Sequence, residues 1–162
     1  MIERFRQGAP AELWQSMVRE GAERAGCTLD EDCESHLVFV LLRYQREPHV
    51  LTRTQALDWL EAQQRVGSAR AEALRDVGDR CLIVAGLFPG LAKRRRVSVD
   101  YFVDLGRGAY QAVGDAGRSA QAQLFAHLAD LYRDLVHVLS SLRDATRPRD
   151  LRTFAADDIR FG

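Results

Sequence analysis

The stretch Asp76–Val113 constrains the fold most strongly, because its pattern predicts two buried helices joined by a basic turn. In its first half, apolar and small residues recur at three- and four-residue spacings, as on one face of a helix. From Cys81 onward nearly every position is apolar, and a helix that is apolar all round is normally buried. Pro89 and Gly90 then interrupt the helical pattern, since proline lacks an amide donor and glycine allows the chain to turn.

A second helix is predicted after this turn. Ser98 suits its N-cap, because a serine hydroxyl accepts a hydrogen bond from a first-turn amide. Gly106 and Ala109 lie in the middle of its apolar stripe, where small side chains let another helix approach closely; a ligand-binding notch is the alternative interpretation. We therefore expect a central antiparallel hairpin over about residues 69–113, with the stripe formed by Val99, Phe102, Val103, Gly106, Ala109, Tyr110 and Val113.

The totals exclude several classes of protein. A chain of 162 residues with 46% hydrophobic residues is typical of one globular domain and unlike a disordered chain. Lys plus Arg number 23 and Asp plus Glu number 23, so no overall charge attracts the chain to nucleic acid or to a membrane surface. The longest apolar run, Cys81 to Leu87, is far shorter than the roughly 20 residues of a membrane span.

The cysteines predict a reducing environment. Cys27, Cys33 and Cys81 are odd in number and form no Cys-x-x-Cys pair, so three reduced thiols in a cytoplasmic protein are expected. Lys93 is the only lysine, a bias that favours a bacterial, GC-rich source.

The remaining segments also follow helical patterns. Pro10 suits the start of a helix to about Ala25, and either Thr28 or Asp30 can cap the next helix. Turn signals then separate further helices. We expect an all-α single-domain bundle of five or six helices over residues 1–145, followed by a tail at 146–162 that is extended or docked. The expected helices cover about 10–25, 31–47, 52–64, 69–88, 98–113 and 119–144.

The turn of the hairpin carries four consecutive cations, Lys93, Arg94, Arg95 and Arg96, which we call the basic elbow. In one interpretation they only solvate a turn after a helix C-terminus, where the helix dipole favours positive charge. In the other they bind a phosphate or the acidic surface of a partner.

A second candidate site lies on the last expected helix. His127, Asp130, Asp134 and His137 are spaced three, four and three residues apart and share one helical face. Imidazoles and carboxylates are ligands for zinc, manganese or iron. One helix does not close a metal site, however, and no second Glu-x-x-His pair of the kind found in di-iron bundles is present. A solvated polar face, or a surface that senses pH or a partner, is the alternative.

These features favour a non-enzymatic adaptor or regulator that binds a partner protein, or a second copy of itself, through the tail and the basic elbow. A helical-bundle metal-binding protein or enzyme using the last helix is the alternative. A weaker hypothesis is nucleic-acid binding through the elbow, supported by Arg143, Arg147 and Arg149. No catalytic residue and no cofactor are assigned.

Overall fold

The computed structural model describes residues 2–47 and 55–145, and every regular element in these two ranges is an α-helix. The all-α prediction is confirmed, but the expected number of five or six helices is wrong, because a short helix forms in the elbow and the last helix is divided. The eight described helices are α1 (Ile2–Ala25), α2 (Glu31–Arg46), α3 (Gln55–Gln64), α4 (Gly67–Leu87), α5 (Pro89–Arg94), α6 (Val99–Asp115), α7 (Ala120–Asp130) and α8 (Tyr132–Ala145).

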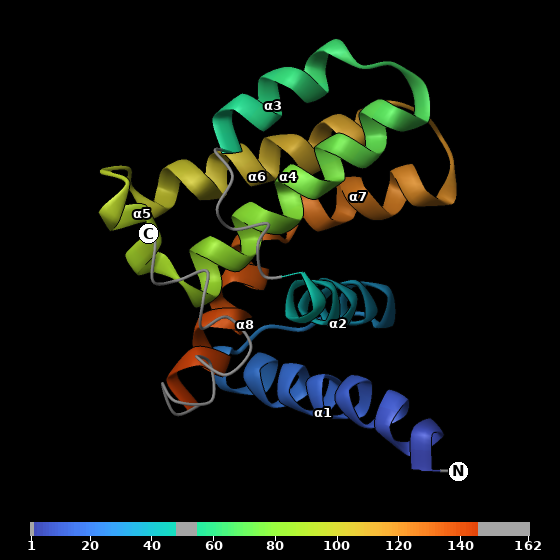
Figure 1. Ribbon diagram of the computed structural model, residues 1–162, viewed down its shortest axis with the longest axis vertical. Helices are drawn as coiled ribbons and strands as arrows, with labels where there is room; N and C mark the ends of the chain where they lie inside the picture. Colours follow the sequence, from blue (N-terminus) through green and yellow to red (C-terminus); the bar gives the residue numbers. More distant parts are fainter. Residues whose placement is uncertain (1, 48–54, 146–162) are drawn as a thin grey trace.

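The helices form two groups that α8 connects. Figure 1 shows α3, α4, α6 and α7 on one side of the molecule, α1 and α2 on the other, and α8 running from the first group to the second. Helix α4 is central, since it packs against α3, α6 and α8. Its C-terminal half is buried on all sides from Val77 to Leu87, as the apolar run after Cys81 predicted.

The hairpin is present but its connection differs from the expected one. Helices α4 and α6 run in opposite general directions (Figure 1) and pack against each other more extensively than any other pair in the described ranges. Pro89 does not simply end α4, because it also begins α5, where its missing amide donor costs nothing. The chain leaves α5 through Arg96, whose φ of 59° lies in the left-handed region.

The predicted close helix contact at Gly106 is confirmed. A Cβ atom on Gly106 would lie 2.7 Å from Cβ of Cys81 on α4 and would overlap the phenol of Tyr132 on α8. Gly78 plays the matching part on α4, where the ring of Tyr110 occupies the position of the missing side chain. The two glycines let α4, α6 and α8 meet around two tyrosines.

Three helix starts are fixed by side-chain caps. Ser98 accepts a hydrogen bond from the amide of Tyr101 at 3.0 Å, as predicted. Ser119 caps α7 in the same way, and Asp30, rather than Thr28, caps α2.

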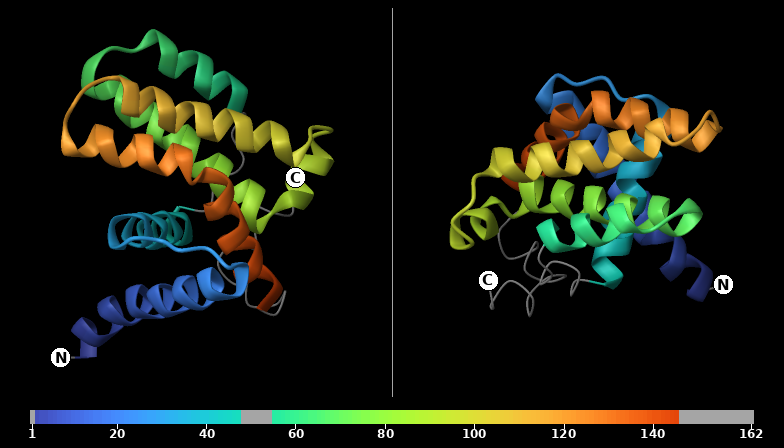
Figure 2. Two further views of the ribbon diagram at one scale, coloured as in Figure 1. Left: turned by 180° about the vertical axis from the view of Figure 1, so that it is seen from behind. Right: turned by 90° about the horizontal axis from the view of Figure 1, so that it is seen from above.

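The last helix is not continuous, contrary to the prediction for 119–144. Leu131 has φ −94° and ψ 8°, and the chain changes direction sharply there (Figure 2). Neither proline nor glycine causes this break. The two halves have different partners, because α7 packs mainly on α6 while α8 packs on α1 and α4.

None of the described helices combines the length and apolarity that a bilayer crossing needs. Cys33 and Cys81 are buried, Cys27 is half-buried, and all three carry free thiols. The division into a domain at 1–145 and a tail at 146–162 stays a prediction, since the tail lies outside the described residues.

Candidate functional site

A cleft of about 290 Å³ opens where α8 passes the N-terminal ends of α5 and α6. Its apolar lining comes from four helices, α4, α5, α6 and α8. Its polar lining comes almost entirely from α8. The lining residues are Ala85, Pro89, Val99, Asp100, Val103, Arg133, Val136, His137, Ser140 and Arg143.

Two arginines give the cleft a basic border. Arg133 lies 3.5 Å from Asp100 and 3.7 Å from Asp104, so this guanidinium is shared between two carboxylates of α6. Both carboxylates are more than 70% exposed, and ion pairs this exposed are weak and exchange readily with other partners. Within the described part of the chain, Arg143 forms an ion pair with its neighbour Asp144, at 3.4 Å.

The basic elbow connects two of the segments that line this cleft. Pro89 precedes the elbow in the sequence and Val99 follows it, and both of these residues line the cleft. Lys93, Arg94 and Arg96 are exposed and Arg95 is half-buried.

Arg94 and Arg95 also interact with other groups of the protein. The elbow side chains therefore differ, with Lys93 and Arg96 exposed on either side of the half-buried Arg95.

The four residues of the predicted metal stripe do not come together at one site. His127 Nε2 lies 2.9 Å from Asp30 Oδ2, at the start of α2. Asp130 is exposed, and the backbone carbonyl of Asp134 accepts a weak hydrogen bond from the Cys27 thiol. His137 lines the cleft. The break at Leu131 explains this distribution, because it places the two histidines on differently directed helices.

A buried polar network lies in the core and was not predicted as a unit. The Tyr110 hydroxyl donates a hydrogen bond to Asp79 Oδ1, and His36 Nε2 lies 3.1 Å from the Tyr110 oxygen and 3.3 Å from Asp79 Oδ1. Arg43 approaches Asp79 Oδ2 at 3.6 Å and also pairs with Asp76. The network joins α2 to α4 and α6.

The centre of the network is closed to solvent. Asp79 is 4% exposed, His36 9% and Tyr110 0%, whereas the side chains of Arg43 and Asp76 at its edge are 29% and 34% exposed. Burial, and then the charge of Asp79, raise the pKa of Tyr110 well above its usual value, which keeps the phenol protonated as a donor. We assign it a structural role.

Sequence reasoning missed this network, although two signals were present. Asp79 and Arg80 lie directly before the apolar run that begins at Cys81, and Tyr110 lies on the apolar stripe of α6. A charged residue in an apolar helix requires a buried partner, but the sequence did not identify which one.

No protein-family model matches the chain, and comparisons with curated proteins and with solved structures give no match either.

Proposed function

We propose that the protein is a non-enzymatic adaptor that binds an acidic, partly apolar segment of a partner protein in the cleft. The observation that supports this is an apolar floor beside Arg133 and Arg143. Arginine suits carboxylates because its planar guanidinium donates two parallel hydrogen bonds. A segment with alternating acidic and apolar side chains matches both parts of the lining.

The open shape of the cleft also favours a peptide. Small-molecule and cofactor sites usually occupy about 300–1,000 Å³, and this cleft, at about 290 Å³, is open rather than enclosed. The cleft can hold one apolar side chain of a longer partner segment that continues across the surface. The elbow then supplies Lys93 and Arg96, which attract the acidic segment over a longer range and speed its association.

Nucleic acid fits this surface less well. None of the residues that line the cleft is Phe, Tyr or Trp, so bases lack the large aromatic side chains on which they stack best.

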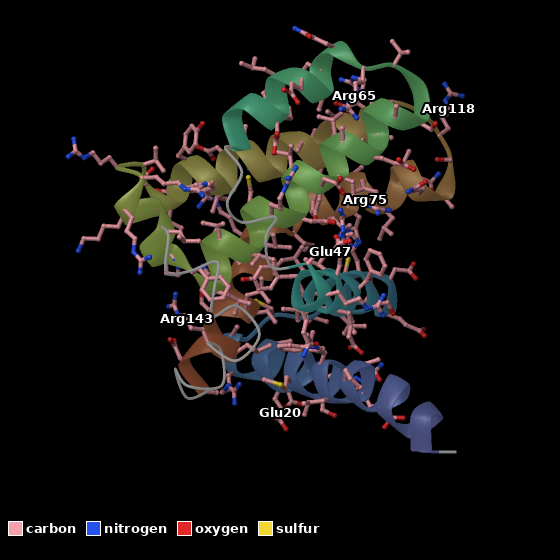
Figure 3. The ribbon with its side chains drawn as sticks, in the orientation of Figure 1. Glu20, Glu47, Arg65, Arg75, Arg118 and Arg143 are labelled. Carbon is pink, nitrogen blue, oxygen red and sulfur yellow. The ribbon has the colours of Figure 1, made fainter. Side chains whose placement is uncertain are left out.

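The test compares one double variant with one single control variant by fluorescence anisotropy, using a labelled peptide that alternates Glu with Leu and Phe. Arg133→Gln with Arg143→Gln should weaken binding at least tenfold, since hydrogen bonds to charged groups are worth about 1.5–3 kcal/mol each. Arg118→Gln is the control, because this exposed arginine lies on the opposite side of the molecule from Arg143 (Figure 3). The affinity of this variant for the peptide should equal that of the wild type.

The elbow is tested separately. Lys93→Gln with Arg96→Asn should slow association and reduce its salt dependence while the melting temperature stays constant. Asparagine is chosen at 96 because it tolerates a positive φ.

Several results would contradict the proposal. One is that the Arg133/Arg143 variant and the Lys93/Arg96 variant both bind the peptide as the wild type does. Another is that the wild type binds a single-stranded RNA more tightly than the peptide. Dimerisation that Arg133→Gln with Arg143→Gln abolishes would show instead that the cleft binds a second copy of the chain.

A further inference from the structure

A carboxylate, a thiol and an imidazole meet where the start of α2 passes α7. Asp30, Cys33 and His127 each offer one ligand atom, and these three atoms lie within 4.8 Å of one another. Asp30 and His127 are 97 positions apart in the sequence, so only the fold brings them together. Within residues 2–47 and 55–145, no other group of three such side chains is this close.

The N-cap of α2 orients the cluster. Asp30 Oδ1 accepts a hydrogen bond from the amide of Cys33 at 2.8 Å, which leaves Oδ2 directed at His127 Nε2, 2.9 Å away. Cys33 is 0% exposed, whereas the side chains of Asp30 and His127 are 53% and 46% exposed. The carboxylate and imidazole therefore lie at the surface above a buried sulfur atom.

A tetrahedral zinc site requires the ligand atoms to move, because they now lie within 4.8 Å of one another, with Asp30 and His127 at 2.9 Å. Bonds of about 2.0–2.3 Å to oxygen, nitrogen and sulfur place neighbouring ligand atoms about 3.3–3.6 Å apart. The present hydrogen bond between Asp30 and His127 must lengthen by a few tenths of an ångström. Both side chains are half exposed, so they have room to do so.

The charges also balance. A thiolate and a carboxylate neutralise a divalent cation, with the imidazole as a neutral third ligand. The positive end of the α2 dipole favours the thiolate. Binding of the metal displaces the thiol proton.

We propose that Asp30, Cys33 and His127 bind one zinc ion, with water at the fourth position. Zinc is the expected ion because it accepts sulfur, nitrogen and oxygen ligands together. The bound ion would clamp α2 to α7, two helices that otherwise share few contacts. This site is separate from the peptide-binding cleft and does not depend on it.

The test is a titration of the full chain, kept reduced, with cobalt(II), which replaces zinc and gives an absorption band when bound to a thiolate. One equivalent should bind with this band. Asp30→Asn should weaken binding at least tenfold while keeping the helix cap, since asparagine is an equally good N-cap. His127→Gln, at an exposed position, should do the same, and Cys33→Ala should abolish the band.

Two controls identify the ligands. His137→Gln removes the other described histidine of the predicted stripe, and Cys27→Ala removes the nearest other thiol in the sequence; both should leave cobalt binding unchanged. Zinc at about a hundredfold its dissociation constant should raise the melting temperature of the wild type by about 5–10 °C.

The proposal is overturned if the wild type gives no thiolate-to-cobalt band and no melting shift with zinc. It is also overturned if Asp30→Asn and His127→Gln bind as tightly as the wild type, or if the band is lost in Cys27→Ala and kept in Cys33→Ala. Because Asp30 and His127 are at the surface, their variants decide the question even if Cys33→Ala does not fold.

Discussion

The phenol of Tyr132, on α8, fills the space that a side chain at Gly106, on α6, would need. Its hydroxyl oxygen is the atom that a Cβ on Gly106 would meet first, and it donates a hydrogen bond to the carbonyl of Gly78 on α4 at 2.8 Å. One tyrosine therefore connects three helices, and its position requires a glycine.

Gly106→Ala should lower the free energy of unfolding by about 1–3 kcal/mol, because the added methyl group overpacks the contact with Cys81 and Tyr132. Gly108→Ala on the same helix is the control. Its Cβ would meet only the ring of Trp59 at 3.8 Å, so improved helix propensity should raise stability by about 0.5–1 kcal/mol. Urea denaturation measures both. Equal effects at the two positions would contradict the close contact.

Tyr110→Phe should destabilise the protein by about 1–3 kcal/mol, because buried Asp79 loses the hydroxyl that donates to its Oδ1. Tyr101→Phe removes a hydroxyl from an exposed tyrosine and should change stability little. Denaturation of both variants near neutral pH tests the difference. A cost at Tyr101 that matches the cost at Tyr110 would argue against the buried network.

Stability should fall as the pH rises above about 9. Burial raises the pKa of Cys81 from 9.0 to about 12, so between these values the unfolded chain loses a proton that the folded protein keeps. The stability linked to this thiol is complete below pH 9 and is lost progressively toward pH 12, by up to about 1.4 kcal/mol per pH unit. Tyr110 and Tyr132, whose pKa values burial raises from 10.0, add to the loss above pH 10.

The thiol contribution is isolated by Cys81→Ala. The slope of unfolding free energy against pH between 9 and 10 should be smaller in this variant than in the wild type, whatever the absolute stabilities are. Parallel curves would mean that Cys81 titrates alike in the folded and unfolded states.

A thiol reagent should modify Cys27 slowly in the native protein and the other two cysteines only after unfolding. Cys33 and Cys81 are fully buried, whereas Cys27 is half-buried and burial raises its pKa, which lowers the thiolate fraction. Absorbance at neutral pH, with and without denaturant, counts the reactive thiols. Cys27→Ser should have none in the native state, and a reactive thiol that remains in this variant would show that the core opens readily.

The sequence predicted those features of the fold that depend on a residue and its near neighbours in the chain, such as helix caps and mid-helix glycines. Ser98 was identified as an N-cap from its own chemistry and its place before an apolar stripe, and it forms that cap. Gly106 was identified as a close contact because a mid-helix glycine has an energetic cost that packing must offset. The residues that it contacts, Cys81 and Tyr132, were not predictable, because they depend on how three helices cross.

Features that depend on tertiary packing were missed. Nothing in the sequence around Leu131 marks the end of a helix, since the break follows from the different surfaces that α7 and α8 cover. For the same reason the stripe from His127 to His137 looked continuous. The sequence identified His127 as a candidate ligand, but its partners Asp30 and Cys33 lie near the other end of the chain.

The turn at Leu131 gives the protein a set of built-in spectroscopic reporters. Of its four histidines, three fall in the described ranges, and each has its own surroundings: His36 in the core network, His127 beside the start of α2 and His137 in the cleft. Imidazole proton resonances in an NMR spectrum of unlabelled protein therefore distinguish these three places. Zinc should shift the signal of His127, and an acidic peptide the signal of His137, so that one sample can follow both events separately.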